Sequence, residues 1–237
     1  MYYKKNYALF IFYFLTLIIS NSCGYPEIIR DELIYDNDFE KNNLENIDGG
    51  GIEVFNGSKV LGYFNNDGFT IHLEEPGSHD YVFVSFDLYI HGTWDGNFNG
   101  FQSNDKADKW IMEYKPGMDL FKDPSFDKFI TTFSNSPCFT NYCLRQSYPN
   151  NYPFENNPKT GAFTSDLPKT CKESFFGGKT TLYKIEKSFK TSSGAIVIRF
   201  YDELYQPNAI DKDGLSQQKC DESWSLDNLK IRVIEYN

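Results

Sequence analysis

The chain has little of what many enzymes and nucleic-acid-binding proteins need. Its 237 residues include 3 His, 3 Met and 23 Lys or Arg against 33 Asp or Glu, for a net charge of -10. It has no Gly-x-Ser-x-Gly elbow, no His-Glu-x-x-His motif, no phosphate loop and no dinucleotide-binding glycine motif. The scarcity of basic residues argues against nucleic acid or anionic lipid as the main partner, because both attract a basic surface. Metal cations, neutral sugars and basic proteins fit this charge better.

Long hydrophobic runs are absent after the N-terminus. Lys4 and Lys5 precede one apolar run at residues 7–19, and small polar residues follow it at 20–22. This order is typical of a secretory signal peptide, and the run is shorter than the ~20 residues of a membrane-spanning helix. We therefore predict that residues 1–22 are a signal peptide and that the mature chain is secreted and does not insert into a membrane. An uncleaved signal anchor is the alternative.

Cysteine is also sparse, with five in the chain. If cleavage falls after Cys23, the mature chain keeps four, and an even number in an oxidising compartment predicts two disulfides with three pairings open. A zinc site is the alternative, although the spacing is uneven and no histidine lies near. The cysteines expected to pair are Cys138, Cys143, Cys171 and Cys220. A sequon at Asn56 is the expected glycosylation site.

Aromatic residues are abundant, at 18% of the chain. Within residues 82–90 every second residue is aliphatic or Phe, and no stretch keeps a helical period for more than two turns. Further strands are expected at 69–73, 110–114, 129–133, 182–189, 196–201 and 229–234. Short strands separated by turns, without alternating helices, predict an all-β fold: an antiparallel two-sheet β-sandwich of the jelly-roll kind.

One domain over residues 30–237 is the simplest division of the chain. The strand pattern weakens at about 134–178, a proline-containing stretch that holds three of the four expected cysteines. Forty-odd residues of weak pattern within a compact domain are unusual and often functional. We predict a surface excursion that disulfides hold in place.

Oxygen-bearing side chains gather in three blocks, near residues 36–40, 86–97 and 221–228. Calcium prefers carboxylate and amide oxygens, and a sandwich could bring these blocks together, although none has the spacing of an EF-hand. The alternative is that these acids are solvated turn residues and strand caps.

An aromatic and acidic strand face is also what a neutral sugar would use, since rings stack on sugars and carboxylates hold their hydroxyls. A second aromatic layer or a protein interface would look the same. The candidate ligand-binding residues are Asp87, Tyr89, Trp94, Asp95, Asn97 and Glu222. Of the tryptophans, we expect Trp224 to lie in the core and Trp94 to be exposed.

Catalytic residues are harder to nominate. His72, His79 and His91 are each expected to be plain surface residues. A glycosidase pair of Glu222 with Asp87 or Asp95 requires a carboxylate separation of about 5–10 Å, for which the sequence offers no support.

Six blocks in order, together with the sequence around them, resemble a family of secreted domains in bacterial and protist surface proteins. They lie at 86–90, 93–97, 108–110, 131–135, 146–149 and 221–228. More loosely, the chain is similar to concanavalin-type jelly rolls, including MAM adhesion domains and some carbohydrate-binding modules. The resemblance implies a β-sandwich fold but no activity.

In such folds an acid after the first-strand Phe and an acid at the start of the last strand share a structural cation. The resemblance thus implies structural calcium at Glu40 and Asp227, with Asp38 beside them. We therefore expect a secreted, non-catalytic binding or adhesion module with calcium as its cofactor and a glycan or a cell-surface protein as its partner. A structural coat or matrix component and a glycan-active enzyme are the alternatives.

Overall fold

The computed structural model describes the chain in segments. These are residues 24–98, 106–116, 127–136, 138, 142–171, 178–191, 194–206 and 218–237. The predicted signal peptide at 1–22 and Cys23 lie outside the described residues. Within these segments, no helix has the length and apolar character that crossing a membrane requires.

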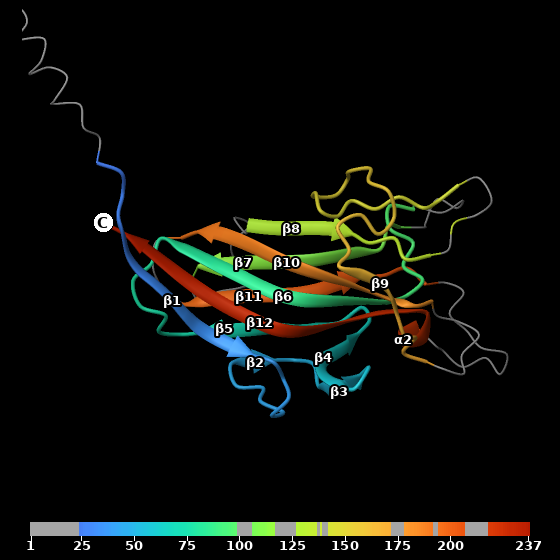
Figure 1. Cartoon of the computed structure of the whole chain (residues 1–237), viewed down its shortest axis with the longest axis horizontal. Coiled ribbons are helices and arrows are strands. Elements are labelled where there is room, and N and C mark those ends of the chain that lie inside the picture. Colours follow the sequence, from blue (N-terminus) through green and yellow to red (C-terminus); the bar gives the residue numbers. More distant parts are fainter. Residues whose placement is uncertain are drawn as a thin grey trace, which may run out of the picture.

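Two antiparallel sheets form the fold, as predicted (Figure 1). The larger sheet has the order β3-β4-β12-β6-β10-β9, with β1 also paired to β12, and the smaller has the order β2-β5-β11-β7-β8. The elements are β1 (Ile28–Asn37), β2 (Ile47–Asp48), β3 (Ile52–Phe55), β4 (Ser58–Phe64), β5 (Gly68–Leu73), β6 (Tyr81–Gly92), β7 (Lys109–Pro116), β8 (Asp127–Thr132), β9 (Thr164–Leu167), β10 (Thr180–Lys190), β11 (Ile196–Glu203), α2 (Gln218–Asp221) and β12 (Glu222–Tyr236).

The sandwich core follows from the period of two in β6. Val82, Val84, Phe86, Leu88 and Ile90 point inward and are at most 3% exposed. Burying a side chain of this size contributes about 1.5–3 kcal/mol, so this one strand anchors a substantial part of the core. Each stretch predicted to be a strand overlaps an observed strand.

Gln146 organises the excursion at 134–178, and its side chain is fully buried. Its amide oxygen accepts hydrogen bonds from the backbone N–H groups of Ser134 and Lys159, and its amide nitrogen donates to the carbonyls of Tyr148 and Thr160. One buried side chain therefore satisfies four backbone groups that no strand ladder could pair. The excursion lies at the end of the sandwich where α2 lies and β12 begins (Figure 1).

The two predicted disulfides form, and the structure resolves their pairing. Cys138 bonds to Cys143, five residues away, and Cys171 bonds to Cys220, 49 residues away. The first closes a short loop inside the excursion. The second ties the excursion to α2, immediately before β12.

The two disulfides should differ in their contribution to stability. A cross-link restricts the unfolded chain more when it closes a longer loop, so the loop lengths imply about 4 kcal/mol for Cys171–Cys220 and about 2 kcal/mol for Cys138–Cys143. Urea unfolding of the Cys171→Ser/Cys220→Ser and Cys138→Ser/Cys143→Ser variants would measure both. A larger loss from the short loop would contradict the prediction.

Candidate functional site

Three carboxylates converge at the end of the sandwich near the excursion. Asp95 follows β6, Asp108 precedes β7 and Glu222 begins β12. One ligand oxygen from each lies within 4.8 Å of the other two, and among the described residues this is the one group of three His, Cys, Asp or Glu side chains that meets this criterion. We call Asp95, Asp108 and Glu222 the acidic trio.

Each member of the trio is one or two residues from a tryptophan. Trp94, Trp110 and Trp224 are all fully buried, and the rings of Trp110 and Trp224 are 5.9 Å apart. The Trp94 indole N–H donates to the Ser223 carbonyl. The trio therefore lies beside the hydrophobic core, where charges are poorly screened.

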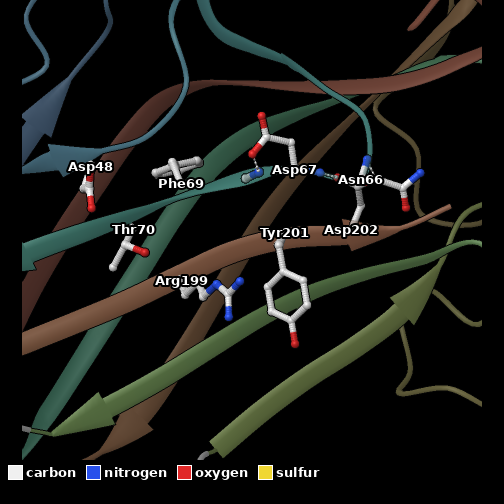
Figure 2. A pocket seen from close by; sticks show the side chains of 9 residues that line it. Asp48, Asn66, Asp67, Phe69, Thr70, Arg199, Tyr201 and Asp202 are labelled. Carbon is white, nitrogen blue, oxygen red and sulfur yellow. Dashed lines mark hydrogen bonds between the residues drawn. The ribbon is translucent and has the colours of Figure 1, made fainter. Parts of the chain in front are cut away.

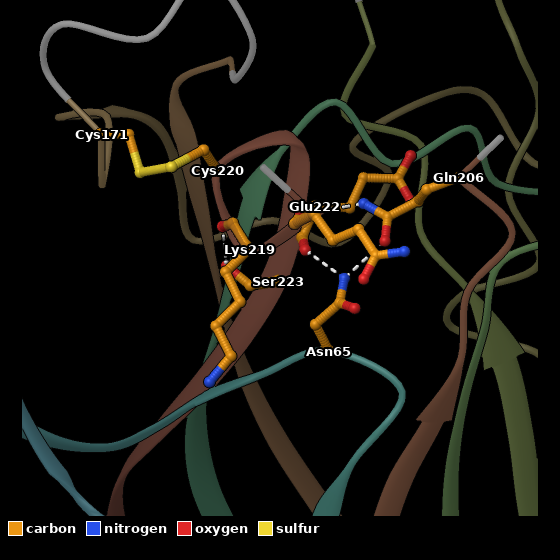
Figure 3. The surroundings of a disulfide bond; sticks show 8 residues. Asn65, Cys171, Gln206, Lys219, Cys220, Glu222 and Ser223 are labelled. Atoms are coloured by element: carbon orange, nitrogen blue, oxygen red, sulfur yellow. Dashed lines mark hydrogen bonds between the residues drawn. A yellow bond between two sulfur atoms is a disulfide. The ribbon is translucent and has the colours of Figure 1, made fainter. Parts of the chain in front are cut away.

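The start of β12 is held against the end of β6. Gly92 has a φ of +84°, and a Cβ there would lie 1.8 Å from the Asp221 carbonyl oxygen, so only glycine permits this approach. The Asn65 side chain donates to the Glu222 carbonyl, and Cys171–Cys220 fixes the preceding helix (Figure 3). These contacts fix the backbone that carries Glu222.

Hydrogen bonds satisfy only some of the carboxylate oxygens of the trio. The Asp108 carboxylate accepts from the backbone N–H groups of Asp95 and Tyr205, and Asp95 accepts from the Ser136 hydroxyl. Glu222 Oε2 is buried and has no hydrogen-bond partner. No ion pair among the described residues includes a trio member.

Burial and mutual repulsion make three negative charges costly here. Two unit charges 4.8 Å apart repel by roughly 3 kcal/mol at an effective dielectric constant of about 20. Burial raises the pKa of Asp108 and, together with the neighbouring acids, raises that of Glu222 well above its ordinary value. The trio can therefore retain protons or bind a cation.

A glycosidase pair finds no support in this geometry. Asp95 and Glu222 are close enough, but Glu222 is 4% exposed, so a sugar ring has no access to its carboxylate. Asp87 is opposite Asp227 in the β12–β6 register, and Asp227 is five residues along β12 from Glu222. At 3.4 Å per residue, the positions of Asp87 and Glu222 are therefore about 17 Å apart along the strands.

The predicted calcium ligands lie on the outer face of the larger sheet. Asp227 is opposite Asp87 in the β12–β6 register. Burial raises the pKa of Asp227 to about 6, with further contributions from the charges of Asp87, Glu40 and Asp38. The fold thus brings the first and last strands together as expected.

These outer-face acids are not arranged to coordinate one calcium ion together. Glu40 already accepts hydrogen bonds from the Ser58 hydroxyl and the Lys59 backbone N–H, and Asp38 and Glu40 are exposed. Within the described part of the chain, Asp38, Glu40 and Asp227 are not among the groups of three ligand atoms close enough to share an ion. Calcium at this position stays a prediction.

A groove of about 490 Å³ opens on the same outer face. Ser85, Asp87, Lys184, Glu186, Asn228 and Lys230 line it. The Asp87 carboxylate accepts from the Asn228 amide at 3.0 Å and pairs with Lys184 at 3.2 Å. Of the predicted ligand-binding residues, Asp87 lines this groove and Tyr89, half-buried, is two residues along β6.

Other predicted ligand-binding residues are engaged inside the protein. The expectation that Trp94 is exposed is wrong: it is fully buried because the sandwich closes over it. Asn97 donates to the Phe154 carbonyl and accepts from the hydroxyls of Thr132 and Ser147, so it holds the excursion. Trp224 lies in the core, as expected.

The expectation of surface histidines is wrong at two positions. His91 is fully buried, bonds to Thr180 and Ser225 hydroxyls, and has its pKa lowered to about 3 by burial. The rings of Phe55 and Tyr63, from the β3–β4 hairpin, pack on it. His79 is 2% exposed and contacts the Gly77 carbonyl.

A second groove, of about 420 Å³, lies on the smaller sheet (Figure 2). Asp48, Asp67, Thr70, Arg199 and Tyr201 are among its lining residues. The Arg199 guanidinium lies 4.4 Å from the centroid of the Tyr201 ring. Sequence reasoning did not single out this surface.

Asp108 is the trio member that sequence reasoning missed. It stands in one of the six blocks, two residues before Trp110, but it is separated from Asp95 and Glu222 along the chain. Asp108 and Glu222 each stand two residues before a tryptophan, and Asp95 directly follows one. This repeated closeness of an acid to a tryptophan was the available pattern.

Comparisons with known proteins identify no family for this chain. No protein-family model and no curated protein matches the chain. Among solved structures, the carbohydrate recognition domain of Emp47p is similar, with a TM-score of 0.36 and 12% identity, over 85% of this chain and 97% of that chain. A likeness of this degree carries no argument about what this chain binds.

The burial of Asp227, together with the nearby charge of Asp87, predicts a pH effect on stability. Asp227 has a pKa of about 6 in the fold and an ordinary value of 3.8, so the folded state binds more protons between these values and its stability falls as pH rises through that window. In EDTA, Asp227→Asn should therefore raise the melting temperature at pH 7 and have little effect at pH 4.

Thermal melts at both pH values test this prediction, with Glu74→Gln, at an exposed position, as the matched control. A lower melting temperature for Asp227→Asn than for wild type at pH 7 in EDTA would contradict it.

Proposed function

We propose that the chain is an extracellular, non-catalytic binding module whose ligand is a glycan, bound in the outer-face groove of the larger sheet. Two disulfides support an oxidising, extracellular location, since such bonds are rare in the cytosol. The acidic composition fits a neutral sugar better than a polyanion.

The observation that carries the proposal is a bulge in β12. The register between β12 and β6 shifts between Asp227 and Lys230, and Asn228 has a φ of +53°. A bulge re-aims side chains, and here it turns the Asn228 amide onto the Asp87 carboxylate. Two strands that are part of the core therefore hold a carboxylate and an amide side by side.

This pairing suits sugar hydroxyls, which both donate and accept hydrogen bonds. A carboxylate accepts hydrogen bonds from hydroxyl groups, and an amide and an ammonium group donate hydrogen bonds to them. The ring of Phe163, with 67% of its surface exposed, lies near this pair. The Lys184 ammonium, which bonds to Asp87, is 4.9 Å from the centroid of that ring. An exposed ring beside fixed polar groups offers both the stacking and the hydrogen bonding that a pyranose needs.

Asp87→Asn should weaken glycan binding by about tenfold or more, because a hydrogen bond to a charged group contributes about 1.5–3 kcal/mol. An array of neutral and acidic oligosaccharides would identify a ligand, and titration of that ligand would compare the variants. Asp48→Asn, the same chemical change in the groove of the smaller sheet, is the matched control and should bind as wild type does.

If the protein bound no oligosaccharide on the array, the glycan proposal would be wrong. That result would favour a structural coat or matrix role or a protein partner. Loss of binding in Asp48→Asn with retention in Asp87→Asn would instead move the site to the smaller sheet.

A further inference from the structure

The acidic trio is a different site from the outer-face groove and from the predicted calcium ligands. Its members come from the ends of β6 and β12 in the larger sheet and from the start of β7 in the smaller one. Whatever binds all three carboxylates therefore joins the two sheets at this end of the sandwich.

The trio lacks a counter-charge in the described part of the chain. The charges of Asp221 and Asp202 also act on Glu222, so the acids nearest to the trio increase the negative potential. Asp221 already accepts a hydrogen bond from the Thr93 hydroxyl, and Asp202 accepts one from the Trp224 indole. These two acids are held in place by the protein, whereas the trio keeps free acceptor capacity.

Glu222 supplies the independent indication of a ligand. Its side chain belongs to a residue that is 4% exposed, and its Oε2 atom has no hydrogen-bond partner. One of its carboxylate oxygens lies within 4.8 Å of an oxygen of each of the other two carboxylates. Buried polar atoms are nearly always satisfied, and an unsatisfied carboxylate oxygen is especially unfavourable. A bound cation would satisfy this atom and relieve the repulsion together.

We propose that Asp95, Asp108 and Glu222 bind one divalent cation, and that this cation is calcium. All three donors are carboxylate oxygens, which hard cations prefer. Two oxygens on opposite sides of Ca²⁺ are up to about 5 Å apart, while those on Mg²⁺ are about 4 Å apart, so carboxylate oxygens that all lie within 4.8 Å of one another can share one calcium ion without moving closer together. Asp95, which is partly exposed, would provide the side from which the ion and its remaining water ligands enter.

Terbium luminescence and thermal melting of the purified chain test this site directly. Tb³⁺ substitutes for Ca²⁺ and emits when a nearby indole is excited, and the trio lies beside Trp94 and Trp224. After EDTA treatment, wild type should show sensitised Tb³⁺ emission that CaCl₂ displaces. CaCl₂ should also raise the melting temperature more than equal MgCl₂ does.

Glu222→Gln should weaken calcium binding at least about tenfold, as loss of a ligand charge would. Its melting temperature in EDTA, equal to or above that of wild type, would show that it folds, because the substitution removes a buried charge. Asp95→Asn, which keeps an oxygen for the Ser136 hydroxyl, gives a second test at a less buried position. The matched control is Glu74→Gln, the same chemical change at an exposed position, which should keep both calcium responses.

Extracellular calcium-binding modules typically have dissociation constants of about 10⁻⁴–10⁻³ M. The proposal would be overturned if wild type showed no response at calcium concentrations several times above this range. A full response in folded Glu222→Gln, a loss of response in Glu74→Gln, or an equal response to magnesium would also overturn it. Because none of these measurements uses a sugar, failure here is distinguishable from failure of the glycan proposal.

Discussion

Repulsion among buried carboxylates is the constraint on which one end of this sandwich depends. Asp95, Asp108 and Glu222 lie within 4.8 Å of one another, beside three buried tryptophans. Their positions are not free to relax, because the glycine contact at Gly92 and the Cys171–Cys220 disulfide fix the start of β12. Concentrating negative charge at this end therefore costs stability, and the calcium ion that we propose would offset this cost.

The outer face of the larger sheet treats its acids differently. There Asp87 has an ammonium and an amide partner, and Glu40 has a hydroxyl and a backbone N–H. These partners neutralise or satisfy the acids without an ion, and the groove stays open to solvent. Charge that is balanced and accessible suits reversible ligand binding, whereas charge that is buried and unbalanced suits a permanently bound ion.

The sequence predicted the sheets better than the sites. Strict alternation in β6 identifies its buried face, and an even cysteine count predicts two disulfides, because both depend on local pattern or on simple pairing. Burial on the second face of a strand has no such pattern: His91 is covered only because the β3–β4 hairpin folds over it. Trp94, beside a turn, is buried because the sandwich closes over it, and its indole N–H reaches the Ser223 carbonyl, a contact across 129 residues. The trio combines segments that only the tertiary fold brings together.

The most direct measurement of the central claim is anomalous X-ray diffraction from crystals grown in calcium. The account predicts one anomalous peak about 2.3–2.6 Å from carboxylate oxygens of Asp95, Asp108 and Glu222. A peak at Asp87 and Asp227 instead, or none among the acidic trio in crystals grown at millimolar calcium, would contradict it.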